Sequence, residues 1–131
     1  MSQTRTRIAK VNTVIIPVAD IDKSIAFYVD TLGLEKRVDL PFGGEHRWVE
    51  VAPEGADTTI AICPPGPSNQ AGNKETGISL QVGDVDAYHA ELKEAGVDVD
   101  AEVSRMGDPV PPMFWFRDPE GNSLLVVEAS A

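Results

Sequence analysis

Histidine and cysteine, the side chains that most readily act as a base or a nucleophile near neutral pH, are few in this sequence. The chain has two histidines, His46 and His89, and one cysteine, Cys63. His46 follows Glu45 and lies four positions before Glu50. A histidine with carboxylates nearby can act as a general base or as a metal ligand. A solvated loop histidine is the simpler interpretation, and both interpretations stay open.

The second histidine and the cysteine have structural explanations. His89 follows Val85 by four positions in a predicted helix, which places it beside the helix–sheet packing or on the solvent side. A thiolate at Cys63 would be a nucleophile, but no histidine is close to it in sequence, so a buried structural cysteine is favoured. The sequence has no Ser-His-Asp pattern, phosphate loop or paired-carboxylate motif. Catalytic residues are therefore not predicted.

Aromatic residues form a second group that suggests a site. Trp48 corresponds to Phe114 when the halves are aligned at 66 positions, the separation of Pro53 and Pro119. Related strands that place Trp48 and Phe114 toward one cavity would make an apolar wall, whereas the alternative is that these rings fill the core. Glu50 would be the single charge of such a lining. It favours a cationic or hydrogen-bond-donating ligand.

The chain that positions these residues contains an internal repeat. The segment Val18–Ser24 recurs in pattern as Val82–Tyr88, 64 positions later. Each copy has the same order: a strand, a Val-x-Asp turn, a helix, a glycine break and more strands. A unit of this length cannot close a hydrophobic core alone, so the two copies must pack together. Ligand sites tend to form at such a seam.

The first copy predicts four strands and one helix. Asp20 or Asp22 caps the helix, which carries one apolar stripe and ends before Gly33. The first strand is β-branched and apolar, which predicts burial on both faces, while Pro17 indicates an edge position. The predicted strands are 11–18, 34–40, 47–52 and 58–63, and the helix reaches residue 32.

The second copy repeats this scheme after a linker at 64–76. Asp84 or Asp86 caps its helix, and the strands are predicted at 78–82, within 97–106, at 113–117 and at 123–128. The fold class is therefore α+β: two β-α-β-β-β modules form a curved, mostly antiparallel sheet cup with the helices outside. We expect a flexible arm at 1–10 and one domain at 11–131, with modules at about 11–63 and 77–128.

The composition excludes several classes of function. The net charge is −10 and the isoelectric point is about 4.5. Nucleic acids and anionic membranes attract clustered Lys and Arg, so neither is an expected partner. A single cysteine cannot form an internal disulfide, and a reducing cytoplasm is expected. The sequence shows no apolar run long enough to span a membrane and no apolar core of a signal peptide.

The repeated pattern resembles the vicinal oxygen chelate superfamily, which includes glyoxalase I, extradiol dioxygenases and the bleomycin resistance proteins. The resemblance covers nearly the whole chain, from about Lys10 to Glu128. Three stretches carry it: Val18–Tyr28 followed by Leu32-Gly33-Leu34, Gly77–Val82 with Asp84, and Phe116–Asn122. These stretches are specific for the fold. They say less about the reaction, because one fold hosts many functions.

The resemblance implies a divalent metal in the cup, held by the first and fourth strands of each module. The matching positions here are Thr13, Ala61, Gly77 and Leu125. Alanine, leucine and glycine side chains offer no donor atom, and a threonine hydroxyl is a weak ligand compared with imidazole or carboxylate. Shifting a strand by one residue would flip its faces and does not restore a site. No metal or other cofactor is therefore expected.

We expect a metal-independent protein that binds a small molecule in the cup, in the manner of a drug-sequestering or bleomycin resistance protein. The predicted lining is apolar with a few hydrogen-bonding groups. It comprises Thr13, Ile15, Trp48, Glu50, Ala61, Cys63, Gly77, Ser79, Gln81, Phe114 and Leu125.

Two alternatives stay open. In the first, the chain is a lyase, isomerase or dioxygenase that recruits metal through His46, Glu50 or a partner chain. In the second, it is a structural or regulatory module that kept only the fold. The resemblance also implies a homodimer in which each cup draws on both subunits.

Overall fold

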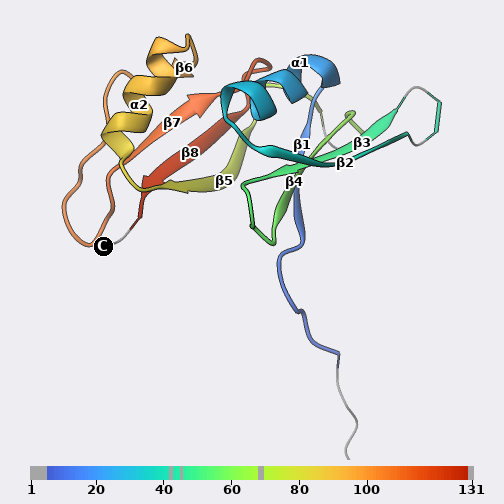
Figure 1. The fold of residues 1–131 in the computed structure, drawn as a ribbon, viewed down its shortest axis with the longest axis horizontal. Helices are drawn as coiled ribbons and strands as arrows, with labels where there is room; N and C mark the ends of the chain where they lie inside the picture. The colour runs from blue at the N-terminus through green and yellow to red at the C-terminus, as the bar shows by residue number, and fades with distance from the viewer. Residues whose placement is uncertain (1–5, 42, 45, 68–69, 130–131) are drawn as a thin grey trace, which may run out of the picture.

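Each half of the chain folds into a four-stranded sheet with one helical segment (Figure 1). The structure is a computed structural model and describes residues 6–41, 43–44, 46–67 and 70–129. The first half contains β1 (Thr13–Pro17), α1 (Ile21–Ile25), η1 (Ala26–Thr31), β2 (Glu35–Pro41), β3 (Arg47–Ala52) and β4 (Thr59–Cys63). The second half contains β5 (Glu75–Val82), α2 (Val85–Glu94), β6 (Asp98–Val99), β7 (Met113–Arg117) and β8 (Ser123–Glu128).

Both sheets have the same topology, with strand orders β1-β4-β3-β2 and β5-β8-β7-β6. The first strand of each sheet runs parallel to the fourth, and the other neighbours are antiparallel. In Figure 1, α1 and α2 both lie above the sheets. The predicted α+β class with two β-α-β-β-β units is confirmed, and Pro17 lies in an edge strand as predicted. No helix within the described ranges is long and apolar enough to cross a membrane.

An aspartate side chain caps the start of each helix. Asp20 accepts the Lys23 N–H at 3.1 Å, and Asp84 accepts the Ala87 N–H at 3.0 Å. Each cap satisfies a backbone donor that has no partner inside the helix. Of the two candidate aspartates in each half, the earlier one is therefore the cap.

The helical segment of the first half begins as α1 and continues as a π-helix, η1. Residues of η1 contact the second half. The Leu32 N–H donates to the Phe27 carbonyl five positions earlier, at 3.0 Å. Such turns are rare and local. The Phe27 ring lies 6.1 Å from the Phe116 ring, and the Tyr28 hydroxyl donates to the buried Asp118 carboxylate at 2.7 Å.

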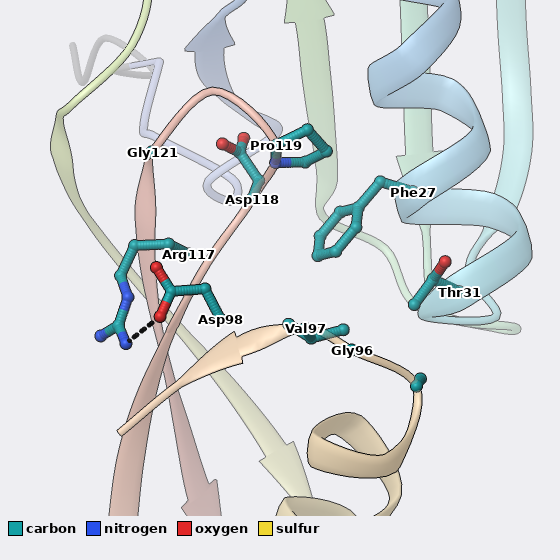
Figure 2. A pocket seen from close by; sticks show the side chains of 10 residues that line it. Phe27, Thr31, Gly96, Val97, Asp98, Arg117, Asp118, Pro119 and Gly121 are labelled. Atoms are coloured by element: carbon teal, nitrogen blue, oxygen red, sulfur yellow. Dashed lines mark hydrogen bonds and ion pairs between the residues drawn. The ribbon is translucent and has the colours of Figure 1, made fainter. Parts of the chain in front are cut away.

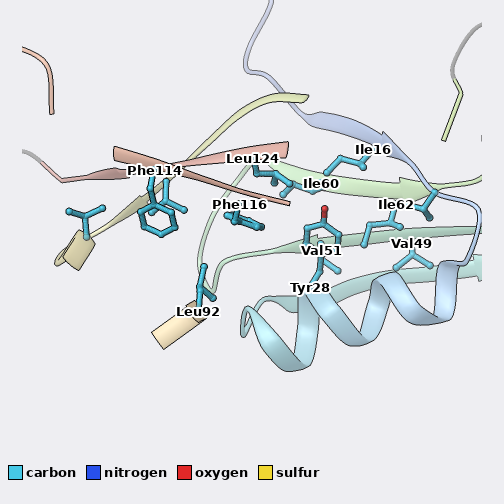
Figure 3. Packing of buried hydrophobic residues seen from close by; sticks show 13 residues of the cluster. Ile16, Tyr28, Val49, Val51, Ile60, Ile62, Leu92, Phe114, Phe116 and Leu124 are labelled. Carbon is cyan, nitrogen blue, oxygen red and sulfur yellow. The ribbon is translucent and has the colours of Figure 1, made fainter. Parts of the chain in front are cut away.

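One hydrophobic core runs through both halves between the sheets and the helices (Figure 3). Alternate residues of the inner strands point into it, as the twofold period of a strand requires. Its members include Ile16, Val49, Val51, Ile60, Ile62, Phe114, Phe116, Leu124 and Val126 from strands, with Tyr28 and Leu92 from helices. The remaining residues of these strands point to the opposite side, which we call the helix-free face.

Three predicted features differ from the structure. The first strand is not buried on both faces, because Ile15 lies on the helix-free face of an edge strand and is 49% exposed. The strand predicted within 97–106 shrinks to β6. Just after β6, the Trp115 N–H of β7 donates to the Asp100 carboxylate at 3.2 Å. A side chain thus takes the place of the backbone carbonyl that would continue the pairing of β6 with β7. The linker is shorter than expected, since β5 begins at Glu75.

Candidate functional site

The helix-free face of the first sheet brings together six of the predicted site residues. They are Thr13 and Ile15 of β1, Trp48 and Glu50 of β3, and Ala61 and Cys63 of β4. Ala61 pairs with Ile15 on one side and with Glu50 on the other, so three side chains form a row across the sheet. Leu40 of β2 lies opposite Trp48 and is 60% exposed. These residues thus form a largely apolar surface around the Glu50 carboxylate.

Hydrogen bonds link four side chains across this face. The Glu50 carboxylate accepts the indole N–H of Trp48 and the hydroxyl of Thr59, each at 2.7 Å. Because Thr59 donates its one proton to Glu50, the Thr13 hydroxyl donates to Thr59, at 2.9 Å. The bond from Trp48, followed by the bond from Thr59, lowers the pKa of Glu50. Glu50 therefore holds a fixed negative charge on this face at neutral pH.

The helix-free face of the second sheet is more open. Ser79 and Gln81 of β5 are exposed, while Leu125 of β8 and Trp115 of β7 are half-buried. Ser79 pairs with Leu125, and Leu125 pairs with Trp115. Gly77 has a φ of 74°, a conformation that favours glycine, where the register of β5 is irregular. Four predicted residues therefore share this face with Trp115, an aromatic neighbour of Phe114 that the predicted lining does not include.

The predicted pairing of Trp48 with Phe114 in one wall is wrong. Trp48 lies on the helix-free face, but Phe114 is fully buried on the helix side. Its ring contacts His89 edge-on at 4.9 Å and lies 6.5 Å from the Tyr88 ring. Phe114 therefore supports the core beneath α2 and is no longer a candidate ligand contact.

The error has a physical cause in the register of β7. Glu50 pairs with Ala61 in the first sheet, and Trp115 pairs with Leu125 in the second. Trp115 is thus the repeat partner of Glu50, 65 positions later. The offset of 66 comes from the turn prolines, and the second half has one residue more between strand and proline. A one-residue shift moves every side chain to the other face.

The positions that the resemblance assigns to a metal do not fit one. The Thr13 hydroxyl is engaged with Thr59, and Ala61, Gly77 and Leu125 have no donor atom in their side chains. Within the described ranges, no three His, Cys, Asp or Glu side chains lie close enough together to hold a metal ion.

The two histidines and the cysteine lie in three different environments. His46 is exposed and lies just before β3, four residues ahead of Glu50, which is a span of roughly 13 Å in an extended chain. Glu45 lies outside the described residues. The His89 ring lies 2.7 Å from a backbone carbonyl just after β6, at the edge of the helix–sheet packing as predicted. Cys63 is 8% exposed and burial raises the pKa of its thiol, as predicted for a structural cysteine.

A cavity between the two halves has no signal in the sequence, because its walls come from segments far apart in the chain. It measures about 440 Å³. Figure 2 shows Phe27 and Thr31 of η1 on one side and Asp98 and Arg117 on the other. Arg117 donates to Asp98 and to Asp100, each at 2.8 Å. These two ion pairs already engage Arg117. The cavity is therefore a weaker candidate for ligand binding than the helix-free face.

Comparisons with known proteins agree with this fold. Residues 10–126 match the family described as the Glyoxalase/Bleomycin resistance protein/Dioxygenase superfamily. One similar solved structure is that of TnmS3, an antibiotic binding protein from Streptomyces sp. CB03234, whose sequence is 35% identical to this chain. The match covers 96% of this chain and 100% of that chain, with a TM-score of 0.83. A superfamily member from Sphaerobacter thermophilus DSM 20745 is 36% identical, with 93% and 98% covered at a TM-score of 0.85.

A curated relative is similar over the same extent. The uncharacterized protein YetH of Bacillus subtilis (strain 168) is 29% identical over 121 residues, which cover 92% of this chain and 99% of that protein. The family match spans most of the chain, and the module order and the sheet topology agree with it. As its repeated pattern predicts, the chain belongs to the Glyoxalase/Bleomycin resistance protein/Dioxygenase superfamily.

Proposed function

We propose that this protein binds a small molecule without a metal, and that the ligand lies against the helix-free faces of the two sheets. The hydrogen-bonded chain of Trp48, Glu50, Thr59 and Thr13 carries this proposal. It fixes a carboxylate beside an indole ring where the resemblance predicts a metal. Each Glu50 oxygen accepts one of these bonds, and a carboxylate oxygen can accept two. Each oxygen therefore retains capacity for a donor of the ligand.

The ligand that fits this face is an apolar molecule with a cationic or hydrogen-bond-donating group. Trp48 and Ile15 supply apolar area beside Glu50, and Trp115 and Leu125 supply it on the second sheet. The net charge of −10 also attracts a cation. TnmS3, which is 35% identical to this chain, is an antibiotic binding protein. An antibiotic-type molecule is accordingly the ligand class that we propose.

We also propose that two copies form the binding cup together. The two helix-free faces belong to separate sheets, and β1 and β5 are edge strands of those sheets. Edge strands present unpaired backbone groups that favour pairing. Placing β1 of one copy beside β5 of a second would bring Thr13 and Ile15 next to Gly77 and Ser79. We place the homodimer in the cytoplasm, because the single cysteine is a buried free thiol.

Tryptophan fluorescence tests the binding proposal. The chain contains two tryptophans, and both Trp48 and Trp115 lie on helix-free faces. We expect saturable quenching by at least one member of a panel of bleomycin and other cationic antibiotics. Glu50→Gln should weaken that binding roughly tenfold, because it removes a charged hydrogen-bond acceptor. Glu91→Gln makes the same charge change on α2 and should leave the affinity unchanged.

Two outcomes would overturn the proposal. If no compound quenches the fluorescence or raises the melting temperature, a structural or regulatory module is favoured. Calorimetric titration of the chelator-treated protein with Ni²⁺, Zn²⁺, Mn²⁺ and anaerobic Fe²⁺ tests the enzyme alternative. Stoichiometric binding at micromolar concentration or tighter would favour a metal-dependent enzyme.

A further inference from the structure

The cavity between the two halves is separate from the binding surface proposed above. We call it the seam cavity. Its walls are η1 of the first half and, from the second half, the residues that follow α2 and the turn between β7 and β8. None of the predicted site residues belongs to its lining within the described ranges. Its volume of about 440 Å³ is that of a small-molecule site.

The walls of the seam cavity carry more negative than positive charge. Asp98 and Asp118 line it, and Arg117 is the one cation in the described lining. Arg117 is already compensated, because it donates to Asp98 and to Asp100 at 2.8 Å each. The lining residues 95–96 directly follow α2, and the C-terminal end of a helix adds partial negative charge. The cavity therefore favours a cation over an anion.

The buried carboxylate of Asp118 has no cation as a partner in the described structure. It is 5% exposed and forms no ion pair within the described ranges. Its two oxygens accept four hydrogen bonds, from the Tyr28 hydroxyl, the Asn122 side-chain amide and the backbone N–H groups of Glu120 and Asn122. All four donors are neutral groups. A cation in the adjoining cavity would supply the opposite charge that favours a buried carboxylate.

The repeat indicates that the fold does not require a buried charge at this place. The counterpart of Tyr28, 64 positions later, is Leu92, and the counterpart of Asp118, 66 positions earlier, is Ala52. Both counterparts are buried and apolar, and a Pro-Glu-Gly turn follows Ala52 as it follows Asp118. The π-helix η1 likewise occurs in the first half only, within the described ranges, and π-helical turns are frequent at functional sites. The features that distinguish the halves thus meet at the seam cavity.

Two side chains on opposite sides of the seam cavity can hold an organic cation (Figure 2). Asp98 uses one carboxylate oxygen for Arg117, and its side chain is 71% exposed, so the second oxygen can accept a donor of the ligand. The Phe27 ring is half-buried and lies 6.1 Å from the core ring of Phe116. It supplies an apolar wall whose aromatic face also attracts cations.

We propose that the seam cavity is a second ligand site, which takes a small organic cation with an ammonium or guanidinium head and an apolar or aromatic body. The head lies beside Asp98, and the body packs on Phe27. This inference does not depend on the function proposed above, because the two sites use different residues. Since the walls come from both halves, a bound cation also stabilises the docking of one half on the other.

NMR titration with three probes of nearly equal size tests this site. The probes are benzylamine, which is a cation at neutral pH, its neutral analogue benzyl alcohol and the anion benzoate. Gly96 and Gly121 line the cavity, so their backbone amide signals report on it. We expect benzylamine to shift both signals saturably at millimolar concentration. Benzyl alcohol should bind roughly fivefold more weakly, and benzoate should produce no saturable shift.

Single charge removals locate the bound cation. Asp98→Asn should weaken the binding of benzylamine roughly fivefold, because it removes a charged acceptor and leaves Arg117 less compensated. Asp57→Asn makes the same change at an exposed position before β4, outside the described lining, and should leave the affinity unchanged. Glu50→Gln should also leave it unchanged. Equal weakening by Asp98→Asn and Asp57→Asn would show that only the net charge attracts the amine, which contradicts the site.

Three further results would overturn the inference. If benzylamine shifts neither glycine signal, the seam cavity does not bind the cation. If benzyl alcohol binds as tightly as benzylamine, the cavity does not recognise charge. If benzylamine shifts the indole signal of Trp48 instead, and Glu50→Gln abolishes that shift, the amine binds to the helix-free face. The last result would support the function proposed above while excluding the second site.

Discussion

The Glu120 carboxylate of the second half accepts a hydrogen bond from the backbone N–H of Ala19 in the first half. Its two oxygens lie 2.7 and 2.9 Å from the Ala19 nitrogen. It also accepts the Asp20 N–H at 2.8 Å. Asp20 is the N-cap of α1, so a turn of one half stabilises the start of the helix in the other. The repeat counterpart Glu54 is exposed and has no such bond in the described structure. The two halves are therefore docked asymmetrically.

Replacing Glu120 should destabilise the protein more than replacing its repeat counterpart. Glu120→Ala removes the acceptor of two backbone donors, and we expect it to lower the free energy of unfolding by about 1–2 kcal/mol. Glu54→Ala deletes the same side chain at an exposed site and should change stability by less than about 0.5 kcal/mol. Urea denaturation measures both values. Equal losses would show that the Glu120 contact does not contribute to stability.

Tyr28 should make the protein sensitive to alkaline pH. Burial, followed by the charge of Asp118, raises the pKa of Tyr28 far above the usual value of about 10. A folded pKa above the unfolded pKa stabilises the folded state below pH 10, and this contribution decreases as the pH rises further. The free energy of unfolding should therefore fall above about pH 10.

The variant Tyr28→Phe should remove most of this alkaline slope. At pH 7 it should also cost about 1–3 kcal/mol, because the buried Asp118 carboxylate loses a donor. Tyr88→Phe is the control: burial raises its pKa too, but Tyr88 is half-buried and should account for the smaller part of the slope. If Tyr28→Phe leaves the alkaline slope unchanged, the assignment to Tyr28 is wrong.

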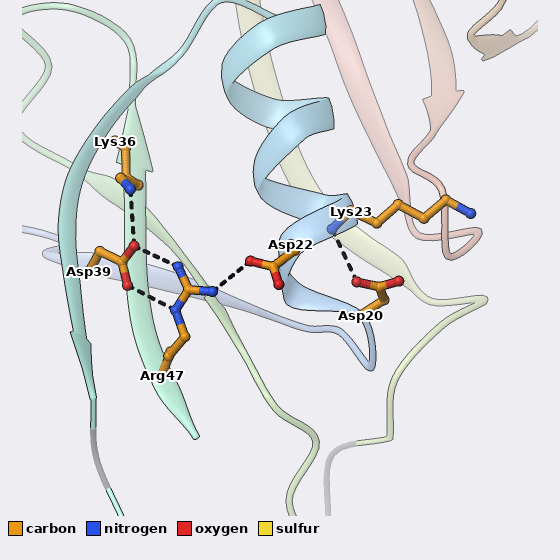
Figure 4. A network of polar contacts seen from close by, with 6 residues as sticks. All are labelled: Asp20, Asp22, Lys23, Lys36, Asp39 and Arg47. Atoms are coloured by element: carbon orange, nitrogen blue, oxygen red, sulfur yellow. Dashed lines mark hydrogen bonds and ion pairs between the residues drawn. The ribbon is translucent and has the colours of Figure 1, made fainter. Parts of the chain in front are cut away.

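Asp39 should contribute to the acid limit of stability. Its carboxylate accepts two bonds from Arg47, at 3.0 and 2.6 Å, and one from Lys36 at 3.0 Å (Figure 4). Hydrogen bonds from Arg47, then from Lys36, lower the pKa of Asp39 to about 2. A lowered folded pKa gives stability that is complete above the unfolded value of about 4 and is lost as the pH falls toward 2.

Asp39→Asn should therefore flatten the decline of the unfolding free energy between about pH 4 and pH 2. Asp22 offers a matched control. Arg47 also donates to it, at 2.6 Å, but its side chain is 82% exposed. Asp22→Asn should leave this slope nearly unchanged. A parallel loss of slope in both variants would mean that overall charge, and not the Asp39 contact, sets the acid limit.

Much of the fold follows from local patterns in the sequence, whereas the contacts between halves do not. The twofold period of each strand and the aspartate caps mark the elements, and both caps lie at predicted aspartates. The contact of Tyr28 with Asp118 joins residues 90 positions apart, and no local pattern indicates it. The segment Met113–Phe116 is apolar throughout, so alternation does not reveal its faces. Only the pairing with β8 fixes them.

That register makes a final prediction about Trp115 and Phe114, which are adjacent in sequence and lie on opposite faces. Phe114→Ala deletes a fully buried ring and should cost about 3–5 kcal/mol of stability. Phe114→Leu should cost less stability than Phe114→Ala, and it should leave the affinity for an antibiotic that quenches the fluorescence unchanged. Trp115→Phe keeps most of the apolar area and should change stability little, but it should alter both the affinity and the quenching amplitude. If Phe114→Leu changes the affinity and Trp115→Phe does not, the ligand lies on the helix side of the second sheet.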